Sequence, residues 1–321
     1  MKKRALVAGA GGFIGGHMAC RLIKDGYNVT SVDIKQPEFR DIQPGETFIR
    51  DDLRDPYFTK AIVADGFDCV FQYAALMGGM GFISGDNDAD IQHDSCLINL
   101  NMLDGIAACS VKPKIFYASS ACVYPERNQL DPNNPVCSES SAYPAAPDSE
   151  YGWEKLFSER LYKSYQRNKG VDVRIARFHN IFGEFGTYDG GKEKAPAAMC
   201  RKVAQAPDGG EIEVWGDGKQ TRSFLHVDEC VEGVLRLMRS DYSDPLNIGS
   251  DELVTINQLA DMVIKISGKK LEVKHVKGAQ GVRGRCSDNL LIDQVLGWRP
   301  KRKLVDGLET TFRWINGKVN P

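Results

Sequence analysis

Tyr151 and Lys155 lie four residues apart, a spacing that suits acid–base chemistry on an alcohol. On a helix, residues at i and i+4 share one face and lie about 6 Å apart. The lysine ammonium would stabilise a tyrosinate and lower the phenol pKa from its usual value of about 10 toward neutrality. The phenolate could then take a proton from a substrate hydroxyl while a hydride leaves the carbon. Ser120 lies 31 residues upstream of Tyr151 and could orient the same hydroxyl.

A glycine-rich segment near the N-terminus predicts a binding site for a dinucleotide. Gly9, Gly12 and Gly15 recur at every third position. This spacing permits a tight turn, brings backbone amides close to a pyrophosphate and lets a helix pack closely on a strand. Asp33 follows 18 residues after Gly15, where a carboxylate accepts hydrogen bonds from an adenosine ribose and repels a 2′-phosphate, which favours NAD over NADP. The competing interpretation is a glycine-rich turn that binds nothing.

The segments around these residues alternate between apolar strands and stretches of helix length. The N-terminal unit is predicted as a strand over residues 5–8, a helix that ends at Asp25 and Gly26, and a strand over residues 28–32. Further buried strands are predicted over residues 48–52, 69–74, 114–118 and 173–178. The alternation predicts an α/β fold with a doubly wound, Rossmann-type parallel sheet, and it places Ser120 in a loop that faces the nucleotide cleft.

After about residue 178 the alternation breaks down, and we predict a smaller C-terminal α/β lobe that binds the substrate. Its elements would include an isolated strand over residues 211–215 and helices over residues 228–238 and 256–267. We therefore predict an NAD-binding Rossmann domain over residues 1–177. Residues 178–321 would mainly form the substrate-binding lobe, with some segments returning to the first domain.

The composition excludes several classes of protein. The chain has 321 residues, about twice the usual domain size of ~150. With 41 basic and 43 acidic residues it carries a net charge of −2, which argues against nucleic-acid and membrane-surface partners. No apolar run reaches the ~18–20 residues of a spanning helix. The basic start lacks the cleavage site of a signal peptide.

Nine cysteines are scattered along the chain without a CxxC pair. An odd number of unpaired thiols argues against a disulfide framework or a metal site and suits a reducing compartment, so we expect a cytoplasmic protein without a bound metal. Glycine is in excess, with 32 residues or about a tenth of the chain against an average of about 7%.

The chain resembles, over almost its whole length, the extended short-chain dehydrogenase/reductases that act on sugar nucleotides. The motifs that carry this resemblance are GAGGFIG at 9–15, Asp33, DDLR at 51–54, QYAA at 72–75, SSACVYP at 119–125, YGWEK at 151–155, RFHNIFG at 177–183 and NIGS at 247–250. Within the family it is most similar to the GDP-mannose 3,5-epimerases. That likeness is carried by MGGMGFI at 77–83, Ala121 with Cys122, GGKEKAPAA at 190–198, WGDG at 215–218, QTRS at 220–223, GVRGR at 281–285 and SDN at 287–289.

The resemblance implies an isomerase reaction that begins with oxidation of the hexose at C4. A ketone at C4 acidifies the hydrogens on C3 and C5, because the carbanion delocalises into an enolate. Inversion then needs a base on one face of the ring and an acid on the other. The resemblance assigns the base to Cys122 and the acid to Lys194, whereas spacing alone leaves open that Cys122 is a small buried hydrophobic residue. Reduction at C4 would give GDP-L-galactose and GDP-L-gulose from GDP-D-mannose.

The resemblance also implies which residues bind the two ligands. For NAD they are Gly9, Gly12, Phe13, Ile14, Gly15, Asp33, Asp52, Leu53, Ala74, Tyr151 and Lys155. For the nucleotide sugar they are Gly79, Gly81, Ser120, Ala121, Cys122, Asn180, Glu193, Lys194, Ala195, Lys202, Gln220, Arg222 and Arg285. Residues 77–82 would close over the sugar. Arg283 would join Arg285 at the diphosphate, since arginine suits bidentate phosphate contacts, although solvated surface is the competing interpretation. Arg40 and Arg54 are expected to be surface charges.

Two other functions remain open from the sequence. One is a 4-epimerase or another keto-sugar epimerase that acts on a different nucleotide sugar. The other is a regulator that senses NAD without turnover, against which the intact Tyr151, Lys155 and Ser120 argue. Dehydratases of the family carry an Asp-Glu pair where this chain has Ala121 and Cys122, so dehydration is not expected. The resemblance further implies a homodimer formed through two helices of each subunit.

Overall fold

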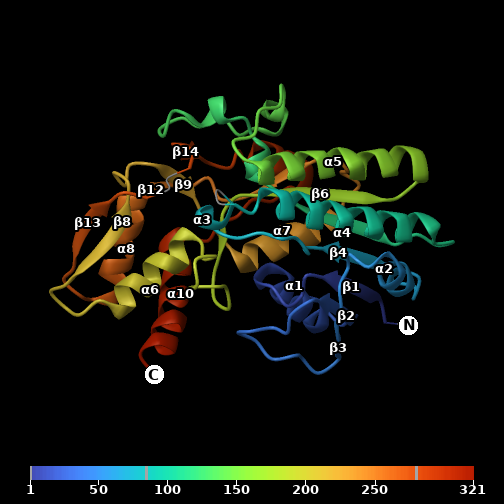
Figure 1. Ribbon diagram of the computed structural model, residues 1–321, viewed down its shortest axis with the longest axis horizontal. Helices are drawn as coiled ribbons and strands as arrows, with labels where there is room; N and C mark the ends of the chain where they lie inside the picture. The colour runs from blue at the N-terminus through green and yellow to red at the C-terminus, as the bar shows by residue number, and fades with distance from the viewer. Residues whose placement is uncertain (1, 84–85, 279–280) are drawn as a thin grey trace.

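A seven-stranded parallel sheet dominates the computed structural model, which describes all residues except 1, 84–85 and 279–280 (Figure 1). The strand order is β11-β6-β5-β4-β1-β2-β3. The bounds are β1 Arg4–Ala8, β2 Asn28–Asp33, β3 Glu46–Arg50, β4 Cys69–Gln72, β5 Lys114–Ser120, β6 Val173–Phe178 and β11 Leu246–Ile248. The order reverses beside β1, which is the topology of a doubly wound Rossmann sheet and confirms the predicted fold class.

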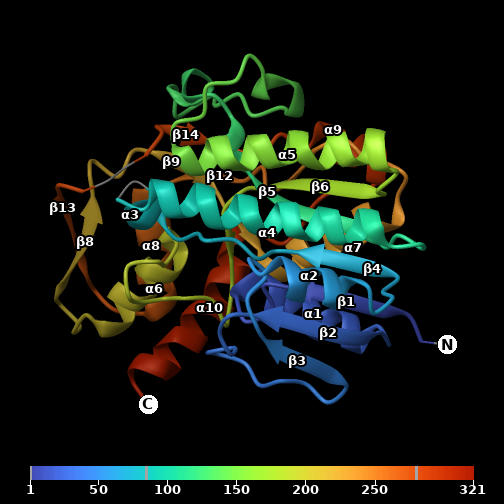
Figure 2. The same ribbon diagram turned by 45° about the vertical axis from the view of Figure 1, so that its right-hand side comes forward.

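Helices cover both faces of this sheet because its strands are apolar on both sides. Val7 of β1 packs with α1 (Phe13–Lys24) and α7 (Val227–Arg239), whereas the next residue, Ala8, points to the opposite face. That face carries α2 (Pro56–Val63), α4 (Asp88–Ala108) and α5 (Glu150–Lys169). Figure 2 shows α4 and α5 side by side across it.

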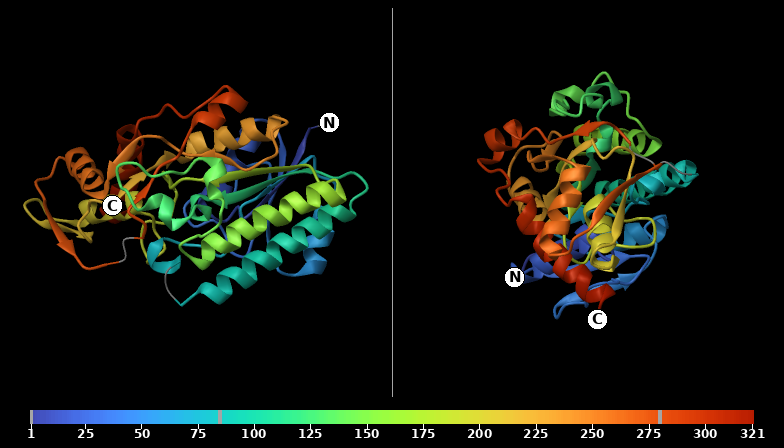
Figure 3. Two further views of the ribbon diagram at one scale, coloured as in Figure 1. Left: turned by 90° about the horizontal axis from the view of Figure 1, so that it is seen from above. Right: turned by 90° about the vertical axis from the view of Figure 1, so that its left-hand side faces the viewer.

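The remaining elements form the smaller lobe, which lies at one end of the molecule (Figure 3). Its core is packed by α6 (Ala195–Gln205), α8 (Ile256–Ser267), α10 (Leu304–Val319) and β8 (Glu211–Trp215). Its shorter elements are β7 (Ile181–Phe182), β9 (Thr221–Ser223), β10 (Leu225–His226), β12 (Leu253–Thr255), β13 (Glu272–Val276) and β14 (Gly284–Arg285). The helix α9 (Leu290–Leu296) instead packs in the core of the large sheet, where Ile292 is buried with residues of α7 and β11. The chain returns to the large sheet with α7 and β11, which pairs with β6.

One predicted element of the smaller lobe differs in its surroundings. β8 matches the strand predicted over residues 211–215, but it is not isolated, because it pairs in parallel with β13. The β13 sequence is EVKHV and most of its residues are exposed or half-buried. Such a strand lacks the run of apolar residues by which the other strands were predicted. None of the described helices is long and apolar enough to cross a membrane.

A buried ion pair fixes α5 against the central strands. Arg177 of β6 donates to Glu159 of α5 through Nη2 at 2.7 Å and Nε at 2.9 Å. The Ser119 hydroxyl of β5 donates to the same carboxylate at 2.6 Å. Each side chain of the pair is only 3% exposed. Because Ser119 precedes Ser120 and Glu159 shares a helix with Tyr151, this contact sets how those two residues meet.

We expect Arg177→Met to lower the free energy of unfolding by about 3–5 kcal/mol, because it leaves the Glu159 carboxylate buried without its partner. Urea unfolding followed by circular dichroism measures the effect. Arg299→Met is the matched control, since its ion pair with Asp293 is exposed and is worth no more than about 1 kcal/mol. Equal losses in the two variants would contradict the assignment of Arg177 as a structural cation.

Candidate active site

The loops that follow β1, β4, β5 and β6 meet at the carboxyl edge of the sheet, where doubly wound proteins bind their ligands. The turn after β1 leads into α1, whose N-terminal residue Gly12 provides no capping side chain. The amides of Phe13 and Ile14 in the first helical turn are therefore not capped by a side chain of the N-cap residue. Such amides, at the positive end of the helix dipole, bind a pyrophosphate.

Asp33 stands at the end of β2, as predicted, and is fixed by two backbone amides. Gly11 N donates to Oδ2 at 2.9 Å and Lys35 N donates to Oδ1 at 3.1 Å. Burial raises the pKa of this carboxyl. Gly11, which the sequence interpretation did not single out, has no room for a side chain, because a Cβ there would lie 2.3 Å from the Lys35 carbonyl oxygen. The turn and carboxylate thus fit the pyrophosphate and ribose of NAD.

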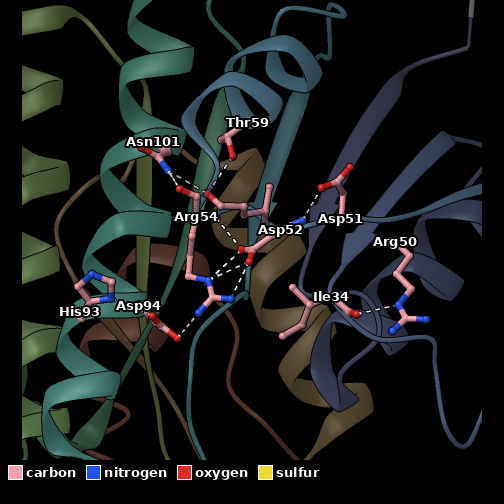
Figure 4. Close-up of polar contacts among 10 residues, drawn as sticks. Ile34, Arg50, Asp51, Asp52, Arg54, Thr59, His93, Asp94 and Asn101 are labelled. Carbon is pink, nitrogen blue, oxygen red and sulfur yellow. Dashed lines mark hydrogen bonds and ion pairs between the residues drawn. The ribbon is translucent and has the colours of Figure 1, made fainter.

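Asp52 and Leu53 lie in the loop after β3, where Figure 4 shows an ion-pair network. Arg54 pairs with Asp52 at 2.6 Å and with Asp94 of α4 at 2.7 Å. This contact lowers the pKa of Asp52. The Leu53 side chain is buried in the core, and its carbonyl accepts a hydrogen bond from Asn101. Arg54 is exposed, as expected of a surface charge, and its ion pairs also hold this loop against α4.

The other expected cofactor residues also lie around the turn. Ala74 follows β4, and the Gln72 side chain fixes its backbone. The Ala74 N–H donates to Gln72 Oε1 and Gln72 Nε2 donates to the Ala74 carbonyl, both at 3.0 Å. Arg40 differs from the expectation of a surface charge. Its guanidinium bonds to Glu46 at 2.8 Å and donates to the Ala10 carbonyl at 3.1 Å, with only 11% of the side chain exposed.

Tyr151 and Lys155 share one face of α5 as predicted, with the Lys155 Nζ atom 5.5 Å from the centre of the Tyr151 ring. Ser120 ends β5 and lies close enough to the Tyr151 phenol to favour its ionised form. The Ser120 hydroxyl accepts from the Cys122 amide at 3.2 Å. These contacts bring three predicted catalytic residues, Ser120, Tyr151 and Cys122, into one group.

The predicted lowering of the Tyr151 pKa is wrong for the protein alone. Burial raises this pKa, and the neighbouring Cys122 and Glu154 raise it further. Lys155 is engaged elsewhere, since it donates to the Tyr117 hydroxyl at 3.3 Å and lies 3.4 Å from a carboxylate oxygen of Glu154. Because Glu154 is buried beside Lys155 and offsets its charge, the i, i+4 pair does not by itself bring the phenol toward neutrality.

Cys122 lies in a short 3-10 helix, residues Ala121–Val123, and is buried against Arg285 of the smaller lobe. Arg285 Nη1 donates to the Cys122 sulfur at 3.1 Å. Gln129 accepts from Arg285 Nε, and the Asp148 carboxylate lies 3.7 Å from Nη2. Nη2 is buried and has no hydrogen-bond partner among the described residues. It is therefore the atom of this guanidinium that remains for a ligand.

A second buried arginine raises the positive potential around Cys122. Burial, together with the nearby Arg285, lowers the pKa of Arg222 to about 10. Arg283 is different, because it lies just before β14 and its side chain is only partly buried. It pairs with Asp217 on the exposed side at 3.1 Å. The structure therefore separates the Arg283 and Arg285 pair and groups Arg285 with Arg222. Two buried cations suit an anionic ligand such as a diphosphate.

Lys194 approaches from the loop that precedes α6. Its ammonium donates to the Gly78 carbonyl at 3.3 Å. Burial lowers the pKa of Lys194, and Cys122 and Arg285 act on the same charge in opposite directions. Lys194 and Cys122 thus lie within electrostatic range of each other, although 72 residues separate them in the sequence. A lowered pKa makes the ammonium a stronger acid.

The other expected substrate residues lie at separate positions in the smaller lobe. Ala195 begins α6, and Glu193 pairs with Arg201 at 3.3 Å. Lys202 donates to the Glu213 carbonyl at 2.7 Å and lies 5.9 Å from the Trp215 ring, away from Cys122. Gln220 donates to the Trp215 carbonyl. Asn180 has a φ of 47° and donates to the Ser223 carbonyl at 2.9 Å.

We expect Gly11→Ala to weaken NAD binding at least about tenfold, which corresponds to about 1.4 kcal/mol, because its Cβ would displace the backbone that holds Asp33. Calorimetric titration of the protein with NAD measures the affinity. Gly317→Ala is the control, since a Cβ at that position would meet no atom within 4 Å. Unchanged affinity in Gly11→Ala would place the dinucleotide elsewhere.

Comparison with known sequences gives a consistent picture. The model of the NAD dependent epimerase/dehydratase family matches residues 5–249. The chain is 48% identical to GDP-mannose 3,5-epimerase of Arabidopsis thaliana, over 98% of this chain and 82% of that protein. It is 47% identical to GDP-mannose 3,5-epimerase 1 of Oryza sativa subsp. japonica, over 99% of this chain and 83% of that protein.

Solved structures share the fold over nearly the whole chain. UDP-glucose 4-epimerase from Thermotoga maritima, solved with UDP-glucose, superposes with a TM-score of 0.86 at 25% identity, covering 99% of this chain and 100% of that one. The Thermus thermophilus UDP-glucose 4-epimerase in complex with NAD has a TM-score of 0.83 at 24% identity, covering 98% and 99%. The glycine turn, Asp33 and the Ser120–Tyr151–Lys155 group lie at the carboxyl edge of the sheet, where doubly wound folds bind dinucleotides. The chain belongs to the NAD dependent epimerase/dehydratase family.

Proposed function

We propose that this enzyme epimerises GDP-D-mannose at C5 and C3 to give GDP-L-galactose and GDP-L-gulose. The observation that supports this most directly is that a thiol, Cys122, and an ammonium, Lys194, lie close to each other at the same site. Cys122 follows β5 and its amide donates to Ser120, which could act at C4, while Lys194 precedes α6 and lies within electrostatic range of Cys122. An epimerase that inverts only C4 needs no such second pair of proton-transfer groups. The nearly full-length likeness to GDP-mannose 3,5-epimerases supports the same substrate.

The first proposed step oxidises C4. Ser120 orients the C4 hydroxyl, and Tyr151 takes its proton. NAD, when bound, supplies the acceptor for the hydride that leaves C4 and later returns it. Because burial raises the Tyr151 pKa in the protein alone and Glu154 offsets the charge of Lys155, the phenolate would require positive charge in addition to the Lys155 ammonium, which lies 5.5 Å from the ring centre.

The second proposed step acts on carbon. The Cys122 thiolate removes the proton from C5 on one face, and the electron pair of the broken C–H bond forms the enolate of the C4 ketone. The Lys194 ammonium returns a proton to C5 on the other face, which leaves a neutral amine. The thiol then loses its proton to solvent and the amine takes one up from solvent, which restores both groups, and the same step at C3 inverts the second centre. The hydride then returns to C4 and Tyr151 returns the hydroxyl proton, so the net redox change is zero.

The nucleotide would extend from Arg285 into the smaller lobe. Arg285 has a buried Nη2 without a hydrogen-bond partner among the described residues, and Arg222 lies beside it, so we assign the diphosphate to these two cations. Farther along, Gln220 has a buried amide oxygen without a partner in the described part of the chain. It adjoins the exposed Trp215 ring and Lys202. We assign the nucleoside to this group.

We also propose that residues 1–177 chiefly hold NAD and residues 178–321 chiefly hold the substrate. A homodimer would form through α4 and α5, because α5 exposes Trp153 and Phe157 on its outer face, four residues apart. All nine cysteines lie outside disulfides, which supports a cytoplasmic location.

Incubation with GDP-mannose in deuterated water tests the proposed function. We expect deuterium at C5 and C3 of the sugar, seen by NMR, because the proton that Lys194 returns exchanges with solvent. GDP-L-galactose and GDP-L-gulose should accumulate together. Inversion at C4 without deuterium at any carbon would favour a 4-epimerase. Neither product nor exchange, with NAD bound, would favour a protein that only senses the dinucleotide.

A further inference from the structure

One short segment, residues 76–83, contacts both groups that the proposed reaction uses on carbon. It ends in the helix α3 (Met80–Ile83). Ile83 packs in a small buried cluster with Cys122 and Tyr151, and Leu76 and Phe82 pack against that cluster. On its other side, the Gly78 carbonyl accepts the hydrogen bond from the Lys194 ammonium. The segment therefore lies between the proposed base and the proposed acid.

Two further contacts join this segment to the loop that carries Lys194. The Gly79 amide donates to the Lys192 carbonyl at 3.0 Å. The Lys192 ammonium lies 4.4 Å from the centre of the Phe82 ring, a cation–π contact. The two segments are therefore joined by one backbone hydrogen bond and one side-chain contact, both made by Lys192, two residues before Lys194. The loop cannot shift its lysine without breaking these contacts.

Gly79 is the point of closest approach between the two segments. A Cβ at this position would lie 2.4 Å from the Glu193 carbonyl oxygen and 3.4 Å from the Lys192 carbonyl oxygen. Both are backbone atoms, so a side-chain rotation cannot relieve the clash. A Cβ at Gly81, two residues later, would meet no atom within 4 Å. The crowding is therefore specific to Gly79, and any side chain there must push residues 192–194 away.

We propose that residues 76–83 and 192–194 form a spacer that fixes the Lys194 ammonium relative to the Cys122 sulfur, with Gly79 as its positioning residue. This inference rests on the proposed function. Proton transfer at C5 and C3 needs Cys122 and Lys194 at a set separation across the sugar ring. Oxidation at C4 uses Tyr151 and Ser120, which α5 and β5 hold independently of the 192–194 loop. The spacer therefore affects proton transfer at C5 and C3 but not oxidation at C4.

Gly79→Ala separates the two processes. We expect the rate of deuterium incorporation at C5 to fall about 100-fold, the cost of misplacing a reacting group by about 1 Å. NADH formation is measured at saturating GDP-mannose, so that a change in substrate affinity at Gly79 does not affect it. The amount of bound NADH should then stay within about threefold of the wild-type value, because Tyr151 and Ser120 are unchanged. Gly317→Ala should change neither readout. Equal losses of exchange and NADH in Gly79→Ala, or no loss of either, would overturn the spacer.

A second pair of variants keeps the test independent of crowding at Gly79. Lys192→Met removes the cation over Phe82 and should slow exchange about two- to fivefold without changing NADH formation. Lys192→Arg retains a cation and should restore the exchange rate. Equal behaviour of the two variants would contradict a positioning role for this contact.

A structural readout distinguishes failure of the spacer from failure of the proposed function. A crystal structure of Gly79→Ala needs no turnover, and we expect residues 192–194 to be displaced and the bond from Lys194 to the Gly78 carbonyl to be broken. An undisplaced loop would overturn the spacer whatever the enzyme catalyses. Absence of deuterium exchange in the wild-type protein would overturn the proposed function instead.

Discussion

A single buried guanidinium joins the two lobes at the point where they act together. Arg285 comes from the smaller lobe and donates to the sulfur of Cys122, which follows a strand of the large sheet. Its other contacts, with Gln129 and Asp148, fix the guanidinium from the side. An uncompensated cation in this position would be costly, so the thiol, the amide and the carboxylate must all be in place. The relative placement of the lobes and the electrostatics of the site therefore depend on the same contact.

Polar groups buried under the site impose a second constraint. Lys155, Glu154 and Tyr117 contact one another beneath Tyr151, and Arg177 with Glu159 anchors the same helix farther along. Buried polar groups of this kind specify one arrangement, because each loses much of its stabilisation when a partner moves. Tyr151 and Ser120 thus stand on a rigid base. Lys194 is held differently, by contacts between two loops, which explains why a small change at Gly79 is expected to affect Lys194 first.

The fold was predictable because its signals are local. The apolar strands, the glycine turn and Asp33 follow from period and spacing within about thirty residues, and the strands lie within a few residues of their predicted bounds. β13 was missed because its polar sequence shows no apolar run. The strand β11 was missed too, because it has only three residues, which is too few to show a periodic pattern. Its pairing with β6 is a property of the tertiary fold.

The site was predictable in its residue types but not in its contacts. Tyr151, Lys155 and Ser120 came from spacing, whereas Cys122 and Lys194 came from family resemblance. No sequence pattern could show that the Tyr151 phenol is buried or that Glu154 is buried beside Lys155, and burial of the phenol is the main reason why its expected pKa was wrong. The separation of Arg283 from Arg285 depends on tertiary contacts, because Arg283 pairs with Asp217 whereas Arg285 is buried against Cys122. The crowding at Gly79 depends on a loop more than a hundred residues away.

The role of Cys122 as the base on carbon is tested most directly by Cys122→Ala. Added GDP-mannose should still reduce the bound NAD, because Tyr151, Lys155 and Ser120 remain. The absorbance of bound NADH should therefore appear and persist, while NMR should detect no deuterium at C5 or C3 of the sugar. Deuterium incorporation at the wild-type rate in Cys122→Ala would contradict the assignment of the thiol as the base.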